Sequence, residues 1–288
     1  MDKTGIEYGP EHFSRRDSLQ LSTIEQDEIP SAYRMGMSPT VEVTTIRFAS
    51  RVVRQLGARN VIDIGCGKGY LDRILGNIFG IKVLCVDKEK ERLRNTLKWN
   101  RLIQEILEER GAIELNGLKY EISGNLCTMA KNLETKYDLQ NILVRASTFF
   151  TLGKPINVES QDVTMVALKI CGDFIYDFVD NFSAVRELVP RHLFKHINFA
   201  IVPCCVEKSK RFPASQNLPK KLAKDGGDDV IMLDMYLYMI ECKDIANADV
   251  CYLNDGYYIF SGEMREDNSR NKGFASSQEE ETKRFFQK

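Results

Sequence analysis

The chain has 288 residues, enough to bury a sizeable core as one large α/β domain or as one domain with appendages, and we expect one domain. Forty basic residues against 41 acidic ones give a formal net charge of −1, so the composition neither favours nor excludes a polyanionic partner. No stretch holds a run of about 18 apolar residues, which argues against secretion and membrane spanning.

We therefore expect a protein of the cytoplasm or nucleus without membrane contact. Composition shifts along the chain predict three parts. These are a polar segment over residues 1–30, one domain over 31–263 with an insertion within 111–160, and a disordered polar tail over 264–288.

The first predicted helix begins after Ser38, a residue type that caps helices. Pro39 would occupy its first position, and Glu42 would complement its positive end. Apolar residues then recur at helical spacing up to Gly57, which indicates an amphipathic helix beside the first strand. An ordinary capped helix explains Ser38 and Glu42 as well as a position near a ligand does.

Eleven residues from Val61 to Leu71, VIDIGCGKGYL, combine a short apolar strand, three glycines at every second position and the start of a helical pattern. Glycine lacks a Cβ, so the backbone can turn tightly and approach a ligand closely, while the helix N-terminus behind it offers free N–H groups. Such a turn cradles a nucleotide-like cofactor, although glycine turns also occur as plain structural loops.

Two acidic residues flank this turn. Asp63 lies two residues before the first glycine, where it would repel a pyrophosphate and suits an ammonium group. The spacing also differs from the GxGxxG of dinucleotide-binding turns, which a nicotinamide-dependent oxidoreductase would need. Asp87 closes the run IKVLCVD, at the offset where a strand-end carboxylate meets ribose hydroxyls. The string DIGCGKG resembles the first motif of seven-stranded, S-adenosylmethionine-dependent methyltransferases. We place that cofactor against Asp63, Gly65, Cys66, Gly67, Gly69, Tyr70, Asp87 and Lys88.

A charged helix is expected after Asp87, with its basic side interpreted as a solvated face rather than a nucleic-acid contact. Its inner stripe is predicted to hold Leu93, Leu97, Ile103, Ile106 and Leu107. A third strand is needed further on, and NILVRAST at 141–148 is the better candidate, with LKYEIS at 118–123 the other.

The next strand is predicted at Val163–Asp173, followed by a helix over 174–188 and a fifth strand at 197–205. Ligands of open α/β sheets bind outside the carboxyl ends of strands. We therefore expect the two strand ends to face the reacting methyl group, with Lys169, Cys171, Gly172 and Asp173 on one and Pro203, Cys204 and Cys205 on the other.

The eight cysteines are scattered, often within apolar runs as at Cys85, Cys171 and Cys242, and are interpreted as reduced core thiols. No CxxC pair is present, so we predict no metal site. A site that joins His192 and His196 to the paired cysteines is conceivable from their spacing, but surface histidines and core thiols explain these residues more simply.

Residues 206–229 carry six basic side chains and two prolines, and they predict a long loop over the active-site edge. We hypothesise that the basic loop 208–224 contacts the phosphates of an RNA, which would make binding salt-dependent. A helix over about 230–245 leads to two apolar strands joined by a turn at Asn254, Asp255 and Gly256.

Several strings together resemble one family of methyltransferase-domain proteins, which includes methyltransferase-like 25 and the methyltransferase half of the glutathione S-transferase C-terminal domain-containing protein. The strings are MSPTVEV, VIDIGCGKGYL, VALKICGD, VPCC and RFPASQ. The resemblance implies an α/β, Rossmann-like fold with a seven-stranded, mostly parallel sheet and a C-terminal antiparallel hairpin. It also implies S-adenosylmethionine binding through Asp63, Gly65, Gly67, Gly69 and Asp87. The chain departs from the family at Lys169, where members tend to have histidine, at Val206, and at Thr40 and Val41.

The expected activity is therefore methyl transfer. A looser resemblance of the paired cysteines to transfer-RNA 2′-O-methyltransferases favours an RNA acceptor, with a protein acceptor or a cofactor-binding scaffold without turnover as alternatives. If a ribose hydroxyl is the nucleophile, Lys169 or Asp173 would assist its deprotonation. A strand-end salt bridge for Lys169 and a helix cap for Asp173 are the structural alternatives.

Overall fold

The computed structural model describes residues 29, 31–109, 113–115, 118–120, 126–151, 161–186, 188–189, 194–254 and 257–265. Most of the polar segment over 1–30, His192, the hairpin residues Asp255 and Gly256, and the tail from residue 266 lie outside this set. No helix in these ranges is long and apolar enough to cross a membrane.

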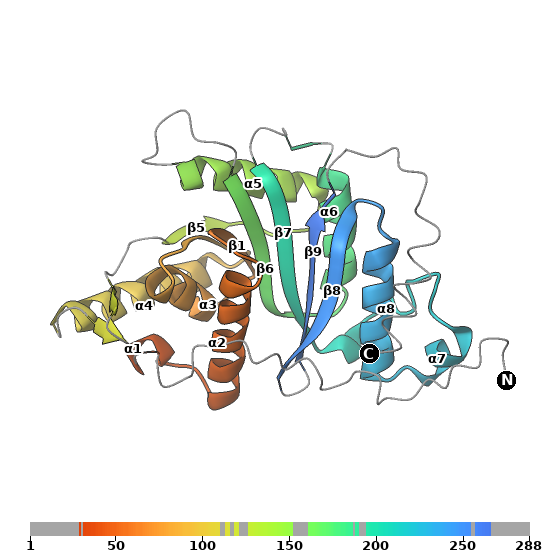
Figure 1. Cartoon of the computed structure of the whole chain (residues 1–288), viewed down its shortest axis with the longest axis horizontal. Coiled ribbons are helices and arrows are strands. Elements are labelled where there is room, and N and C mark those ends of the chain that lie inside the picture. The colour runs from red at the N-terminus through yellow and green to blue at the C-terminus, as the bar shows by residue number, and fades with distance from the viewer. Residues whose placement is uncertain are drawn as a thin grey trace.

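A seven-stranded sheet in the order β5-β2-β1-β6-β7-β9-β8 forms the centre of the fold (Figure 1). All neighbouring pairs are parallel except the two made by β9, which runs antiparallel to both β7 and β8. The predicted fold class and the C-terminal hairpin are confirmed. The strands are β1 (Asn60–Ile64), β2 (Lys82–Asp87), β5 (Leu126–Ala130), β6 (Gln161–Cys171), β7 (Phe194–Cys204), β8 (Ile245–Asn254) and β9 (Tyr257–Met264).

Helices cover the sheet on both faces (Figure 1). One apolar core joins the sheet to α5 (Lys136–Thr151), α6 (Phe174–Val185) and α8 (Asp228–Glu241). The other joins it to α1 (Ser31–Arg34), α2 (Pro39–Arg54), α3 (Tyr70–Arg73) with the π-helical turn Ile74–Ile78, and α4 (Lys90–Glu109). The remaining elements are the 3₁₀ turn Val206–Lys208, α7 (Lys220–Asp225), and the separate pair β3 (Ile113–Leu115) and β4 (Leu118–Tyr120).

Central strands are apolar on both sides because each one feeds both cores. In β1, Val61 belongs to the core under α2, while Ile62 and Ile64 belong to the core under α5. Successive side chains on a strand point to opposite faces, so a strand between two helix layers must be apolar throughout. This requirement explains why the continuous apolar runs at β1, β6 and β7 predict buried strands, as the structure confirms.

The prediction for the third strand was wrong on both candidates. The third parallel strand is β5, which pairs with β2 at one edge of the sheet. Residues 141–148 lie within α5, and residues 118–120 form β4, which pairs only with β3. Residues 141–148 form a helix rather than a strand because helical spacing places five completely buried apolar side chains on one face. These are Leu139, Ile142, Leu143, Ala146 and Phe150.

Smaller boundaries also differ from prediction. The eighth helix ends at Glu241 rather than near Ile245, and β9 includes Met264, one residue beyond the predicted domain end. On α4, Leu97 is exposed rather than on the inner stripe. Thr96 and Asn100 are buried in that stripe instead, where they bond to the glycine turn and to Asn77, respectively.

Candidate active site

The glycine turn lies at the carboxyl edge of the parallel strands, directly after β1. Its start is fastened to the neighbouring strand, because the N–H groups of Gly65 and Cys66 both donate to the carbonyl of Val86, at 2.7 and 3.1 Å. Gly65 is exposed, whereas Cys66 and Gly67 are half-buried. The turn therefore presents its backbone to the solvent at the edge where open α/β sheets bind ligands.

The three glycines of the turn have left-handed φ angles of 71°, 59° and 68°, but different surroundings. A Cβ on Gly65 would meet Ile170 at 2.8 Å, and one on Gly69 would meet Thr96 at 2.2 Å, so these two glycines allow close packing of β6 and α4. A Cβ on Gly67 would find no atom closer than 3.8 Å. Open space over Gly67 leaves room for a ligand against the backbone.

Asp87 connects the turn to the next strand and helix. Its carboxylate accepts hydrogen bonds from the N–H of Gly67 at 3.0 Å and of Glu89 at 2.9 Å, and its side chain is only 3% exposed. Each carboxylate oxygen has a second lone pair, so these bonds leave acceptor capacity for hydroxyl groups. Lys88 follows immediately and is exposed.

Asp63 is buried beside a second acid that the sequence analysis did not identify. Asp72, in the first turn of α3, is fully buried. Within the described part of the chain, no hydrogen-bond partner is present for Oδ1 of Asp63 or for either carboxylate oxygen of Asp72. Burial and the neighbouring carboxylate of Asp72 raise the pKa of Asp63, and burial raises the pKa of Asp72 to about 6. The only sequence signal for Asp72 was an acid inside the apolar pattern GYLDRIL.

The segment before α2 is held against the turn by side chains of α3. Arg73 is buried and donates from both terminal nitrogens to the carbonyl of Met35, at 3.3 Å, and Tyr70 donates its hydroxyl to the carbonyl of Gly36. The Arg73 guanidinium also lies 4.9 Å from the centre of the Tyr70 ring. Tyr70, a predicted cofactor residue, thus lies at the turn and also positions the Met35–Gly36 segment.

Ser38 and Glu42 take structural roles. Ser38 is the N-cap of α2, although its side chain makes no capping hydrogen bond. Glu42 accepts a hydrogen bond from Arg34 at 2.8 Å, which ties α1 to α2.

Lys169 occupies a β-bulge near the end of β6, with a left-handed φ of 60°. Its ammonium group lies 4.5 Å from the centre of the Tyr257 ring, at cation–π distance. The side chain is therefore directed toward β9, and among the described residues its ammonium group makes an aromatic contact instead of the salt bridge considered as an alternative.

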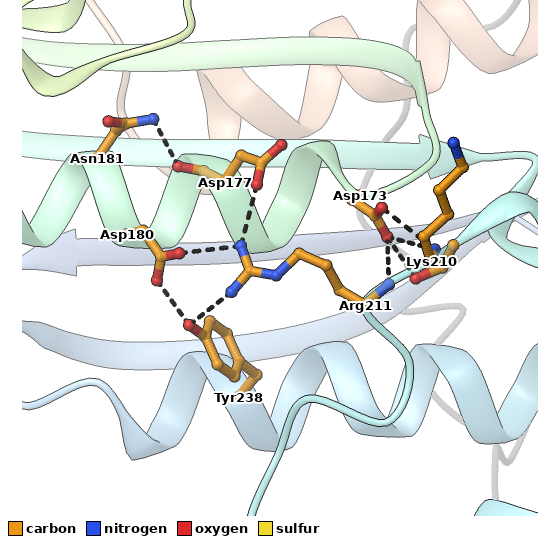
Figure 2. Close-up of polar contacts among 8 residues, drawn as sticks. Asp173, Asp177, Asp180, Asn181, Lys210, Arg211 and Tyr238 are labelled. Carbon is orange, nitrogen blue, oxygen red and sulfur yellow. Dashed lines mark hydrogen bonds and ion pairs between the residues drawn. The ribbon is translucent and has the colours of Figure 1, made fainter.

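Asp173, just past the end of β6, anchors the segment that follows β7 (Figure 2). Its carboxylate accepts hydrogen bonds from the Ser209 hydroxyl at 2.6 Å and from the N–H groups of Lys210 at 2.9 Å and Arg211 at 3.1 Å. Partial burial raises its pKa, but these donors outweigh the burial and hold the pKa below the ordinary value. The residue is the N-cap of α6 by position but makes no side-chain capping bond.

Arg211 is fixed within the protein, as Figure 2 shows. One terminal nitrogen contacts Asp177 at 3.0 Å and Asp180 at 2.9 Å, and the other donates to the hydroxyl of Tyr238. The guanidinium also lies 5.2 and 5.3 Å from the ring centres of Tyr176 and Tyr238. Arg211 is therefore engaged inside the fold, which removes it from the predicted basic surface.

The prediction that Cys171 is a core thiol was wrong, because it is exposed. Its sulfur gathers with those of Cys204 and Cys205 at the ends of β6 and β7, all within 4.8 Å of one another. His196 lies near the start of β7, and eight residues of extended chain place it about 26 Å from the cysteines. His196 thus has no part in that cluster.

The residues at the turn fit a nucleoside ligand that carries an ammonium group. Gly65 is exposed and the space over Gly67 is open. Oδ1 of Asp63 is buried without a hydrogen-bond partner among the described residues, and Asp87 ends the adjacent strand. Asp63, Gly65, Cys66, Gly67, Gly69, Tyr70, Asp87 and Lys88 lie on or beside this one turn, whereas Lys169 and Asp173 lie at the end of β6.

Comparison with known proteins agrees with this geometry. A family model described as a methyltransferase domain matches residues 41–211, and the chain belongs to this family. The protein is an S-adenosylmethionine-dependent methyltransferase. No curated protein matches the chain.

Similar solved structures include magnesium protoporphyrin IX methyltransferase from Synechocystis PCC 6803, with 12% identity over 90% of this chain and 99% of that one, at a TM-score of 0.42. TrmK from M. capricolum has 14% identity over 77% and 68%, at 0.34. The fibrillarin/Nop5p complex has 9% identity over 77% and 83%, at 0.41.

Proposed function

We propose that this methyltransferase acts on RNA, with the acceptor at the carboxyl edge of β6 and β7. The observation that carries the proposal is a row of exposed lysines on the segment after β7, of which Asp173 fastens residues 209–211 to that edge. These are Lys208, Lys210, Lys220, Lys221 and Lys224. Lysines at such a position attract a polyanion and supply phosphate contacts without reading its sequence.

The resemblance of the paired cysteines to transfer-RNA 2′-O-methyltransferases supports the same acceptor class. We extend the proposal to the family group that includes methyltransferase-like 25 and to action in the cytoplasm or nucleus. The donor supplies a methyl group that is already activated on a sulfonium, so the protein has mainly to position the acceptor and accommodate its proton.

Asp63 and Asp87 are proposed to hold the donor together with the glycine turn. Lys169 is proposed to assist deprotonation of the acceptor hydroxyl: its ammonium group, which lies against the Tyr257 ring, would stabilise the negative charge that develops on the hydroxyl oxygen while the proton passes to solvent. For Asp173 the geometry favours positioning, since three hydrogen bonds already occupy its carboxylate.

A cofactor-binding scaffold without turnover is the second candidate. The engagement of Asp173 and Arg211 in internal contacts favours it, because both lie at the acceptor edge and neither is directed to an incoming substrate.

The test incubates the purified chain with tritium-labelled S-adenosylmethionine and total cell RNA or cell protein, and follows the label through nuclease and protease digestion. Label in nuclease-sensitive material supports the proposal. Label in protein alone overturns it in favour of a protein acceptor, and donor binding without transfer to either pool supports the scaffold.

The double change K220E/K221E tests the lysine row directly. Loss of two phosphate contacts should make the fall of log K for RNA binding with log salt concentration less steep, by roughly 1.4 to 1.8 in the slope. The affinity for S-adenosylmethionine should not change. The matched control is R59E/K195E, because both side chains are exposed at the amino ends of β1 and β7, the opposite edge of the sheet. Equal weakening of RNA binding by both doubles would mean that net charge, and not the lysine row, carries the interaction.

A further inference from the structure

Three thiols from separate chain positions converge at the ends of β6 and β7. Cys171 is the last residue of β6, Cys204 is the last of β7, and Cys205 follows it. The sulfurs of Cys171 and Cys204 lie 3.0 Å apart, and the Cys204 thiol donates to the carbonyl of Lys169 at 3.1 Å. In the described ranges, no histidine, aspartate or glutamate joins these three sulfurs.

A β-bulge brings Cys171 to Cys204. Leu168 pairs with Val202 and Ile170 with Pro203, so Lys169 is an extra residue and the register beyond it is shifted by one. Side chains alternate between the faces of a sheet, and a one-residue shift therefore exchanges the faces. Without the bulge, Cys171 would stand opposite Cys205; with it, Cys171 pairs with Cys204.

Cys205 reaches the cluster through a second unusual conformation. Adjacent residues on an extended strand point in opposite directions, so Cys204 and Cys205 would normally be separated by the sheet. Cys205 has a left-handed φ of 53°, which ends the strand and lets its sulfur lie near that of Cys204. The described residues include three non-glycine residues with positive φ, and two of them are Lys169 and Cys205. Such strain persists only where the surroundings enforce it, and it clusters at functional sites.

We propose that Cys171, Cys204 and Cys205 together bind one thiophilic d¹⁰ metal ion, of which Zn²⁺ is the first candidate. Three sulfur ligands select soft or borderline cations over Mg²⁺ and Ca²⁺. Zinc–sulfur bonds of about 2.3 Å in a tetrahedron require sulfurs about 3.8 Å apart, a spacing that the cluster reaches with shifts below about 1 Å. Binding releases the thiol protons, and the positive charge of the cation offsets part of the negative charge of the three adjacent thiolates.

The proposed site has three protein ligands, and one of them, Cys171, is exposed to solvent. Three ligands with one open position is the ligand count of zinc sites that bind a water or a substrate atom, rather than of closed structural sites. The inference goes beyond methyl transfer and does not depend on the acceptor being RNA.

A disulfide between Cys171 and Cys204 is the competing explanation. It would need an oxidant that takes two electrons while the two thiols release two protons, and it would use only two of the three sulfurs. The left-handed conformation that brings Cys205 into the cluster has no role in a disulfide. A metal ion accounts for all three thiols and for both strained residues.

The full-length chain, purified under reducing conditions and stripped of metal, is titrated with Zn²⁺ and separately with Cu⁺ against a competing chelator. We expect one equivalent of at least one of these ions to bind. Loss of an outer partner of a ligand already lowers metal affinity by about 10- to 100-fold, so loss of one sulfur in C171S, C204S or C205S should lower it by at least this much. The matched control is C242S, a half-buried cysteine outside the cluster, which should bind as the unmodified chain does.

Cobalt substitution gives a readout independent of affinity, because thiolate-to-cobalt charge transfer requires sulfur ligands and should weaken in each cluster variant. Circular dichroism of the metal-free variants separates loss of a ligand from loss of the fold, and C171S, at the exposed position, is the mildest change. Binding of both ions no tighter in the intact chain than in C171S and C205S overturns the proposal. Intact mass showing a Cys171–Cys204 disulfide in place of bound metal also overturns it.

Discussion

At the scale of single residues, the most unusual feature is the pair of buried acids beneath the glycine turn. Asp63 and Asp72 are almost completely inaccessible, and burial raises the pKa of each. Two adjacent carboxyl groups in such surroundings cannot both ionise without a large penalty from desolvation and mutual repulsion. A ligand that brings a positive charge to Asp63 would relieve this penalty.

The first prediction is that D72N stabilises the protein at pH 7.5. Folding raises the pKa of Asp72 from 3.8 to about 6. The contribution of Asp72 to stability is therefore complete below pH 3.8 and is lost as the pH rises through about 6. Asparagine avoids that loss, and the gain should be at most about 3 kcal/mol at pH 7.5 and smaller at pH 5. Chemical denaturation at the two pH values measures it.

The matched control is D138N, where the sign is opposite. Asp138 is paired with Lys131 at 2.8 Å, and this contact lowers its pKa to about 2. Its stabilising contribution is present above pH 3.8 and lost as the pH falls through about 2, so D138N should destabilise at pH 7.5. Destabilisation by both variants would show that the Asp72 carboxylate has a compensating partner when the protein is in solution.

The second prediction separates the three glycines of the turn. In G67A the added methyl group meets no protein atom closer than 3.8 Å, so the variant should lose only the left-handed backbone penalty of about 1 to 2 kcal/mol in stability. The methyl group enters the open space and should weaken donor binding. G69A adds a collision with Thr96 and should cost about 2 to 5 kcal/mol. Denaturation and calorimetric titration with S-adenosylhomocysteine measure the two effects.

Two further variants control this comparison. G57A has a φ of 63° with no atom within 4 Å of its Cβ, so it reports the backbone penalty alone and should leave donor affinity unchanged. G69A/T96A should recover part of the stability lost in G69A, because the nearest side-chain atoms are removed. If G67A bound the donor as tightly as G57A does, the ligand would not lie over that glycine.

At the scale of elements, the segment after β7 is fastened to the sheet by carboxylates of α6 and its N-cap. Asp173 holds residues 209–211, and Arg211 lies between Asp177, Asp180 and the Tyr176 and Tyr238 rings. The carboxylates that contact Arg211 are about half exposed, so solvent screening keeps each of these ion pairs weak. Their effect is on the position of the segment more than on the global stability of the fold.

The third prediction is that R211K loosens this segment. Lysine lacks the planar guanidinium with which arginine bridges two carboxylates and a phenol, so these contacts should be lost. Because solvent screens the ion pairs, the free energy of unfolding should fall by only about 1 kcal/mol. The rate of proteolytic cleavage within 209–219 should rise much more than this small loss of global stability would produce. K210A is the control, because the side chain of Lys210 is exposed while its backbone N–H bonds to Asp173. Equal cleavage rates in R211K and K210A would contradict the role assigned to Arg211.

The fourth prediction concerns Asp173 as a positioning residue. D173N should loosen the same segment and raise KM for the acceptor more than it lowers kcat, with an unchanged pH profile of kcat. A catalytic base would instead lose kcat and the corresponding limb of the pH profile. Because its folded pKa is lowered, the stabilisation from Asp173 is present above its ordinary pKa and is lost as the pH falls through the lowered value.

At the scale of the whole molecule, the sheet brings distant chain segments to one edge. The turn after β1, Asp87 after β2 and the cysteines after β6 and β7 meet there because parallel strands end on the same side. The Met35–Gly36 segment closes onto this edge through Arg73 and Tyr70. A ligand at this edge would lie against segments that are far apart in the chain, and its binding should therefore stabilise the whole fold.

The fifth prediction follows from this arrangement. S-adenosylhomocysteine at 100 times its Kd should stabilise the protein by about 2.7 kcal/mol, which raises Tm by roughly 5 to 10 °C. D63A should lose most of the shift, whereas NAD should produce none in either protein. A larger shift with NAD than with S-adenosylhomocysteine would contradict the cofactor assignment.

The sequence by itself determined the order of most elements and placed the proposed cofactor residues around one turn, and its resemblance to a family supplied the fold class. The elements and the turn follow from local signals: apolar periodicity over successive residues, and glycines where the chain needs a left-handed bend. Asp63, the glycines and Asp87 are adjacent in sequence or fixed by strand ends, so pairing β1 with β2 is enough to bring them together.

Only the tertiary structure decided the rest. The choice of β5 over the two predicted candidates, the burial of Asp72, the engagement of Arg211 with α6 and α8, and the convergence of three cysteines all depend on contacts between residues far apart in the chain. The face that Cys171 presents depends on a single extra residue in a strand pairing, and pairing register is a property of two segments rather than of either one alone.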